Sequence, residues 1–230
     1  MVITDRYIGL SALGLIASRD GGSDVRLLES ILGVVVASIS HLLSALVLYH
    51  LADVVCRDRR RALVAALAHV ISPAGVFLSA PYAESTFALF SFTGYLLLAK
   101  SCVAPPAWGD AFTLLAGVAF GLATAFRSNG MLNGVPLAWE FIQGLAWLLE
   151  QQTQQTQPRE LLVESLIARV RRLGVLGISG VLTASGSIIP QAVAYQRFCS
   201  SDPLGPAQLR RPWCDRIPPS IYAFVQDRYW

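Results

Sequence analysis

The stretch LLESILGVVVASISHLLSALVLYHL, from Leu27 to Leu51, decides the fold class of this chain. It exceeds the roughly twenty apolar residues that cross the hydrocarbon core of a bilayer. Its one acidic residue, Glu29, lies near one end. The stretch stops at Asp53 and the cluster CRDRRR of Cys56–Arg61, where each charge would cost about 2.5–3.5 kcal/mol at mid-bilayer. The stretch therefore predicts a membrane-spanning helix.

The composition of the whole chain agrees with a membrane protein. Apolar residues make up 54% of the 230 residues, charged residues make up 14%, and the mean hydropathy is +0.52. A soluble domain carries about a quarter charged residues. The net charge is only +3, and the arginines fall in loops rather than in a stripe, so we expect no nucleic-acid partner. The four cysteines form no CxxC pair, which argues against a zinc site.

Five further apolar segments follow the first one along the chain. Together they predict an all-α, polytopic membrane bundle of about six spanning helices, the others being about Ala62–Ala80, Tyr82–Ala99, Ala111–Phe126, Met131–Leu149 and Leu173–Tyr195. Pro73 predicts a kink or break near Ser72. Gly117 and Gly121 have the GxxxG spacing that lets helices approach closely, although this spacing also arises by chance.

These segments divide the chain into three parts. Residues 1–26 form an N-terminal lumenal or interfacial segment, residues 27–195 form the helical bundle, and residues 196–230 form a lumenal tail rich in aromatic and basic residues. A polar linker, QQTQQTQPRE, lies near residues 150–160, and Leu161–Arg172 looks like an amphipathic helix at the membrane surface. The short apolar run Ile8–Ala17 fits an interfacial helix or the apolar region of a signal peptide.

The short loops predict an orientation. If the loop Arg57–Arg61 is cytosolic, alternation places Lys100 and Arg159–Arg172 on the same side, and the opposite short loops carry almost no positive charge. This distribution follows the positive-inside rule. The C-terminal tail then lies on the other side of the membrane.

Four polar residues collect on that other side. Tyr82 and Glu84 begin one predicted span, and Arg127 and Asn129 follow the end of another. Charged groups at the edge of a bundle are costly unless they are paired, hydrated or functional. We therefore expect Glu84 and Arg127 to form an ion pair or to bind a polar or anionic head group. The alternative is that both residues simply lie at the hydrated interface.

The cysteines and histidines are the remaining candidates for a disulfide or a metal site. Cys199 and Cys214 both lie in the tail, where an oxidising compartment would favour a disulfide, with two free thiols as the alternative. His41, His50 and His69 lie at no metal-ligand spacing, so we interpret them as packing or interfacial residues and predict no metal site. A transporter would need charged residues near the middle of several spans, which these segments lack.

Several motifs together resemble a known family. The motifs are ISPAGVFLSAPYAESTFALFSFTGYLL (Ile71–Leu97), ATAFRSNGMLNG (Ala123–Gly134), YQRFC (Tyr195–Cys199), RPWC (Arg211–Cys214) and PSIYAFVQDRYW (Pro219–Trp230). In this order they resemble the GPI mannosyltransferase 2 family, which adds the second mannose to the glycosylphosphatidylinositol (GPI) precursor. The resemblance extends from about Leu27 to the C-terminus.

The resemblance implies a multi-pass endoplasmic reticulum enzyme of the GT-C type. Its donor would be dolichyl-phosphate mannose, its acceptor the lipid-linked GPI glycan, and its surroundings the membrane lipids; no cofactor would be bound covalently. The family also implies a small membrane partner subunit. By the same resemblance Tyr82, Glu84, Arg127 and Asn129 lie on the substrate side. Arg127 would hold a lipid phosphate, and Glu84 would orient sugar hydroxyls or Arg127.

The implied reaction is an inverting transfer in which a carboxylate acts as general base. GT-C enzymes usually carry this acid in the first lumenal loop, and Asp5, Asp20 and Asp24 are the acidic residues in the corresponding stretch here. None of them has the family's sequence context, so the base is not assigned. The chain looks like the middle part of a longer enzyme. The alternative is a catalytically inactive homologue that acts through packing or partner binding.

Overall fold

The computed structural model describes residues 23–72, 82–151, 159–199, 213–215 and 220–229. These residues form helices and short connections, which confirms the all-α prediction. In chain order the elements are α2 (Ser23–Cys56), α3 (Arg59–Ile71), α5 (Glu84–Ser101), α6 (Pro106–Phe126), the short 3-10 helix η1 (Ser128–Gly134), α7 (Val135–Gln151), α8 (Arg159–Cys199) and α9 (Ile221–Tyr229).

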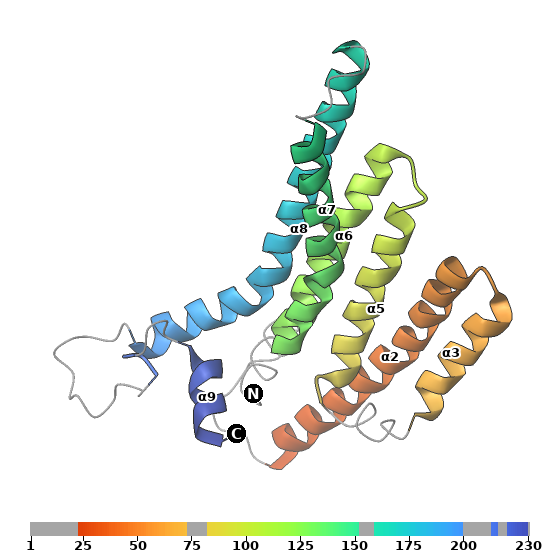
Figure 1. Cartoon of the computed structure of the whole chain (residues 1–230). Coiled ribbons are helices and arrows are strands. Elements are labelled where there is room, and N and C mark those ends of the chain that lie inside the picture. The colour runs from red at the N-terminus through yellow and green to blue at the C-terminus, as the bar shows by residue number, and fades with distance from the viewer. Residues whose placement is uncertain (1–22, 73–81, 152–158, 200–212, 216–219, 230) are drawn as a thin grey trace.

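The long helices lie side by side in a row (Figure 1). Helix α3 packs on α2, α2 on α5, α5 on α6, and α6 on α8, while α7 and η1 pack against α8 and α6. Successive helices alternate in direction, so the bundle has two ends. We call the end where α5 begins and α6 finishes the Arg127 end. The opposite end, where α5 finishes and α6 begins, is the Arg172 end.

Local sequence signals explain the tight turn between α2 and α3. Arg57 has a φ of 52° and donates its backbone N–H to the carbonyl of Asp53 at 2.9 Å. This left-handed residue terminates α2. Asp58 follows as the N-cap of α3, where its side chain accepts a hydrogen bond from the N–H of Arg60 at 2.9 Å. Two consecutive capping residues therefore reverse the chain within three positions.

Small residues bring α6 and α8 into close contact. A Cβ atom on Gly117 would lie 2.7 Å from the Cα atom of Ser179. A Cβ on Gly121 would collide with the Leu182 carbonyl, and one on Gly186 would collide with the backbone of Gly121. The two backbones therefore touch where side chains would normally separate them. The close approach predicted for Gly117 and Gly121 is confirmed.

The apolar core lies beside this contact. Phe120 is fully buried and packs with Ala116 of α6, Leu137 of α7 and Leu176 of α8. The ring of Tyr95 on α5 meets the ring of Phe120 edge-on, with their centroids 5.1 Å apart. Residues from four helices, α5, α6, α7 and α8, therefore pack around the ring of Phe120.

The prediction of about six spanning helices is wrong for the described residues. Three helical segments there are long and apolar enough to cross a membrane: Ser30–Cys56, Pro106–Phe126 and Val163–Cys199. Helix α3 has 13 residues and α7 has 17, which at 1.5 Å per residue give about 20 and 25 Å against a hydrocarbon core of about 30 Å. Helix α5 has 18 residues, but Glu84, Lys100 and several hydroxyl side chains lower its hydropathy.

The structure also changes the interpretation of Leu161–Arg172. This stretch and the predicted sixth span form one continuous helix, α8, of 41 residues. At about 60 Å it is longer than a bilayer is thick, head groups included, and its first turns project with the end of α7 beyond the other helices (Figure 1). The stretch is thus the extension of a span rather than a separate surface helix. Pro73 and most of the N-terminal segment, linker and tail lie outside the described residues.

Candidate functional site

An ion pair joins α5 to α6 at the Arg127 end. Glu84 is the first residue of α5, and Arg127 follows the last residue of α6 with an extended backbone. The Arg127 Nη1 atom donates to the Glu84 Oε1 atom at 2.7 Å, and the two side chains are 35% and 36% exposed. The guanidinium carbon also lies 5.9 Å from the ring centre of Phe87. The pair corresponds to the first of the two expected arrangements, and its half-exposed groups remain accessible to a ligand.

A compact turn positions the residues after Arg127. The Gly130 N–H donates to the carbonyl of Arg127 at 2.8 Å. A Cβ atom at Gly130 would lie 2.6 Å from the Cα atom of Thr124, so only glycine lets the turn lie on the backbone of α6. Asn129, just before it, is exposed, and so is Tyr82 at the start of α5. The two predicted residues therefore lie at the same exposed end as the ion pair.

A buried amide fixes η1 beneath this surface. Asn133 is 8% exposed. Its Nδ2 atom donates to the Ser91 hydroxyl at 2.9 Å, and its Oδ1 atom accepts from the Tyr95 hydroxyl at 3.2 Å. Both partners belong to α5, so Asn133 ties η1 to the helix that carries Glu84. The sequence patterns did not single out this residue, although a lone Asn in an apolar segment signals a buried polar contact.

The same end of the bundle carries a disulfide. Cys199, the last residue of α8, is bonded to Cys214, with their Cα atoms 5.6 Å apart. Both are buried with Trp213, and Phe224 of α9 packs against them. The disulfide therefore attaches the described part of the tail to the end of α8.

The sequence profile of one family, described as "Mannosyltransferase (PIG-V)", matches residues 22–230. The chain belongs to the PIG-V mannosyltransferase family. A Chaetomium globosum protein named "GPI mannosyltransferase 2" is 47% identical over 96% of this chain and 48% of its own length. A Gibberella zeae protein of the same name is 37% identical over 88% of the chain and 44% of its own length.

A more distant relative, from Rattus norvegicus, is named "GPI alpha-1,6-mannosyltransferase 2" and is 30% identical over 84% of the chain and 38% of its own length. The PIG-V chain thus spans about half the length of the curated relatives it matches, or less. No solved structure matches it.

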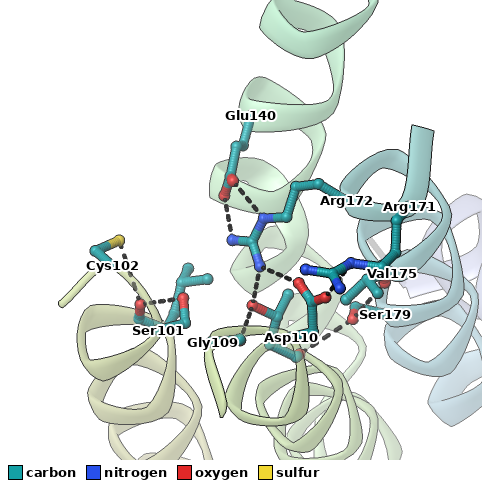
Figure 2. A network of polar contacts seen from close by, with 11 residues as sticks. Ser101, Cys102, Gly109, Asp110, Glu140, Arg171, Arg172, Val175 and Ser179 are labelled. Atoms are coloured by element: carbon teal, nitrogen blue, oxygen red, sulfur yellow. Dashed lines mark hydrogen bonds and ion pairs between the residues drawn. The ribbon is translucent and has the colours of Figure 1, made fainter. Parts of the chain in front are cut away.

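A second polar cluster of this PIG-V chain lies at the Arg172 end (Figure 2). Arg172 of α8 donates from Nε and Nη2 to the two oxygens of Glu140 on α7, at 2.8 and 3.1 Å. Its Nη1 atom donates to the Thr113 hydroxyl at 2.7 Å and reaches Asp110 at 3.5 Å, both on α6. Arg171 donates to the other Asp110 oxygen at 3.0 Å. We refer to these five residues as the Arg172 network.

The Arg172 network was not predicted from the sequence. The contacts of Arg172 join residues 32 to 62 positions apart, so no motif spacing could reveal the network. The only signal was the two carboxylates themselves, Glu140 within a predicted span and Asp110 at the edge of another, because carboxylates at such positions need partners. A contact between two histidines was likewise not predicted from the sequence. The rings of His41 and His69 lie 5.0 Å apart, and the Ser44 hydroxyl lies 2.8 Å from the His69 Nε2 atom, so these two histidines are in contact between α2 and α3.

The Arg127 end carries a partly exposed guanidinium, and its described residues show no metal-ligand set. Within the described residues no three His, Cys, Asp or Glu side chains are arranged to hold a metal ion. The Oε1 atom of Glu84 accepts a hydrogen bond from Arg127. Of the acids considered from the sequence, Asp5 and Asp20 lie outside the described residues, and the side chain of Asp24 is not described.

Proposed function

We propose that this chain carries part of an enzyme that transfers the second mannose from dolichyl-phosphate mannose to the GPI precursor, at the lumenal face of the endoplasmic reticulum membrane. The observation that carries the proposal is the match of the family profile over residues 22–230. The names of the relatives in fungi and rat, and the collection of the predicted residues at one end of a bundle with candidate membrane spans, support it.

Arg127 would bind the phosphate of the dolichyl donor. A guanidinium offers planar paired N–H donors that match phosphate oxygens. Arg127 uses one hydrogen bond on Glu84 and keeps a third of its side chain exposed, so further donors can meet a ligand. A phosphate near the membrane surface would also find its lipid chain directed into the bilayer.

Glu84 would orient Arg127 and accept hydrogen bonds from sugar hydroxyls. Among the described residues only its first carboxylate oxygen is engaged, with Arg127, and a carboxylate accepts about four hydrogen bonds. Tyr82 and Asn129 are exposed polar side chains at the same end and would add contacts to the mannose or to the acceptor glycan. In the transfer the acceptor hydroxyl displaces dolichyl phosphate from the mannose carbon, and a base that we do not assign takes its proton.

The direct test is complementation of a fungal strain that lacks its GPI mannosyltransferase 2. One culture expresses this chain, and a second expresses a chimera, the Chaetomium globosum relative in which the matched segment is replaced by this chain. We expect the chimera to restore growth and the GPI intermediate with two mannoses. Failure of the chimera, with normal abundance and membrane insertion, would contradict the proposed activity and favour an inactive homologue that acts through packing or a small partner subunit.

A charge exchange separates binding from packing. In the chimera, Glu84→Arg combined with Arg127→Glu keeps an ion pair between α5 and α6 but places the positive charge on a different backbone position. If the pair only holds the helices together, the double variant should restore function that either single variant loses. We expect the double variant to remain inactive although its protein level is normal, because Arg127 must face the substrate.

A further inference from the structure

A pocket of about 460 Å³ opens beside the Arg172 network. It lies between the end of α5, the first turns of α6, the middle of α7 and the first half of α8. Arg169, Arg171 and Arg172 line it together with the carboxylates of Asp110 and Glu140. Three positive groups therefore face two negative ones, and the pocket carries one positive charge in excess.

The two carboxylates are neutralised by neighbours. Both oxygens of Glu140 accept from Arg172, and the two oxygens of Asp110 contact Arg172 and Arg171. Arg172 in turn uses all three of its nitrogens within the network. The carboxylates therefore oppose an incoming anion much less than free acids would.

The other two arginines retain binding capacity. Arg171 contacts Asp110 through Nε alone, and its side chain is 54% exposed. Arg169 lies over the ring of Trp147 at 4.8 Å, and this cation–π contact holds the guanidinium without using its N–H groups as hydrogen-bond donors to a carboxylate. Two oriented guanidinium groups at the mouth of one pocket are the arrangement that binds phosphate oxygens.

The depth of the pocket identifies the source of the phosphate. Pro106 and Gly109 line it, and the candidate membrane span of α6 begins at Pro106. Trp108 and Val103 at this level are 65% and 69% exposed, as expected of side chains that rest at the boundary between head groups and acyl chains. A phospholipid can place its phosphate in the pocket and its acyl chains beside these residues.

We propose that this pocket is a binding site for the head group of an anionic phospholipid, held by Arg169 and Arg171 at the Arg172 end. The site lies at the opposite end of the bundle from the Glu84–Arg127 pair and does not depend on the proposed transfer reaction. Bound lipid would fill the space between α5, α6 and α8 and link the bundle to the charge of that leaflet.

The test is native mass spectrometry of the purified chain in detergent, with phosphatidylinositol, phosphatidylcholine or inorganic phosphate added in turn. We expect retention of phosphatidylinositol over phosphatidylcholine. Arg169→Gln should weaken that retention about fivefold, and Arg169→Gln with Arg171→Gln about tenfold or more. The single variant leaves the ion pair of Arg171 intact and so protects the test against loss of folding.

The matched control is Arg59→Gln with Arg60→Gln. These exposed residues begin α3 at the same end of the bundle, so the control removes two positive charges at that end outside the pocket. Its lipid retention should equal that of the unchanged chain. Equal losses of phosphatidylinositol retention in both double variants would mean that the lipid is attracted by positive charge in general, and would overturn the proposal of a specific site. Displacement of the lipid by an equal concentration of inorganic phosphate would overturn the assignment to a phospholipid.

Discussion

The two ends of the bundle use charge in opposite ways. At the Arg127 end one ion pair joins α5 to α6, and about a third of each side chain is exposed. At the Arg172 end one guanidinium contacts two carboxylates and a hydroxyl from two other helices, and its side chain is 23% exposed. Within the part of the chain that the structure describes, Arg172 donates from all three of its nitrogens, whereas Arg127 donates from one.

This difference separates a structural arginine from an accessible one. A surface ion pair contributes about 0–1 kcal/mol, so the Glu84–Arg127 pair adds little to folding. Breaking a multiply bonded, partly buried cluster leaves carboxylates without partners and costs several times more. The comparison therefore assigns a role in stability to Arg172 and a role in ligand binding to Arg127, and each assignment can be tested by changing one arginine.

The largest effect is expected on activity, at the Arg127 end. In the Chaetomium globosum chimera, Arg127→Gln should lower mannosyl transfer in isolated membranes about 100-fold or more, because a preorganised charge on the leaving phosphate is lost. The free energy of unfolding should change by less than about 1 kcal/mol. Labelled GPI intermediates would measure the first quantity, and thermal unfolding the second. A large loss of stability with unchanged transfer would mean that Arg127 is a structural residue and not a ligand-binding one.

The next effect is on folding, at the Arg172 end. Arg172→Met should lower the free energy of unfolding by about 2–3 kcal/mol, since Glu140 and Asp110 lose their shared partner. A denaturant titration in mixed micelles would measure the change. Arg61→Gln is a suitable control, because Arg61 pairs with the adjacent N-cap residue Asp58 and its side chain is 75% exposed. Equal destabilisation by both variants would show that the network is no stronger than a surface pair.

A smaller effect is expected from the buried layer beneath the Arg127 end. Asn133→Leu should cost about 1–2 kcal/mol, because the hydroxyls of Ser91 and Tyr95 lose their bonds to the amide. Asn129→Ala, at an exposed position of the same 3-10 helix, should leave the unfolding free energy nearly unchanged. If the two variants unfolded at the same temperature, Asn133 would not be the anchor of η1.

The smallest effect should come from the outer member of the network. Arg171 has one bond to Asp110 and is more than half exposed, so Arg171→Gln should cost less than about 1 kcal/mol. The same titration that measures Arg172→Met would measure it. A cost equal to that of Arg172→Met would mean that the two arginines act as one unit.

Patterns along the chain were sufficient to predict the long helices, but not the short helices η1 and α9 or the number of spans. The apolar run from Leu27 to Leu51 lies within α2, and the GxxxG pair lies at a real helix contact. Apolar runs do not reveal where a helix stops, however. The cap at Asp58 and the end at Ile71 leave α3 too short to span, and hydropathy averaged along the chain cannot detect caps of this kind.

The candidate site shows the same division. The sequence could predict that Glu84 and Arg127 lie close together. Each lies at the end of an apolar segment, and the alternation of the helices places both ends on one side of the membrane. The same could not be predicted for Arg172, Glu140 and Asp110, because their contacts depend on the rotation of α6, α7 and α8 about their own axes. Asn133 was also missed, because its burial depends on the turn at Gly130, which the pattern of apolar residues does not reveal.

The four cysteines have a consequence for orientation in the membrane. Cys56 and Cys102 are free and exposed, and they close α2 and α5 at the Arg172 end, whereas Cys199 and Cys214 are bonded to each other at the Arg127 end. A maleimide that cannot cross membranes, added to sealed microsomes, should therefore modify the chain from one face only. The natural sequence already contains the labels for a topology measurement, and no reporter residue has to be introduced.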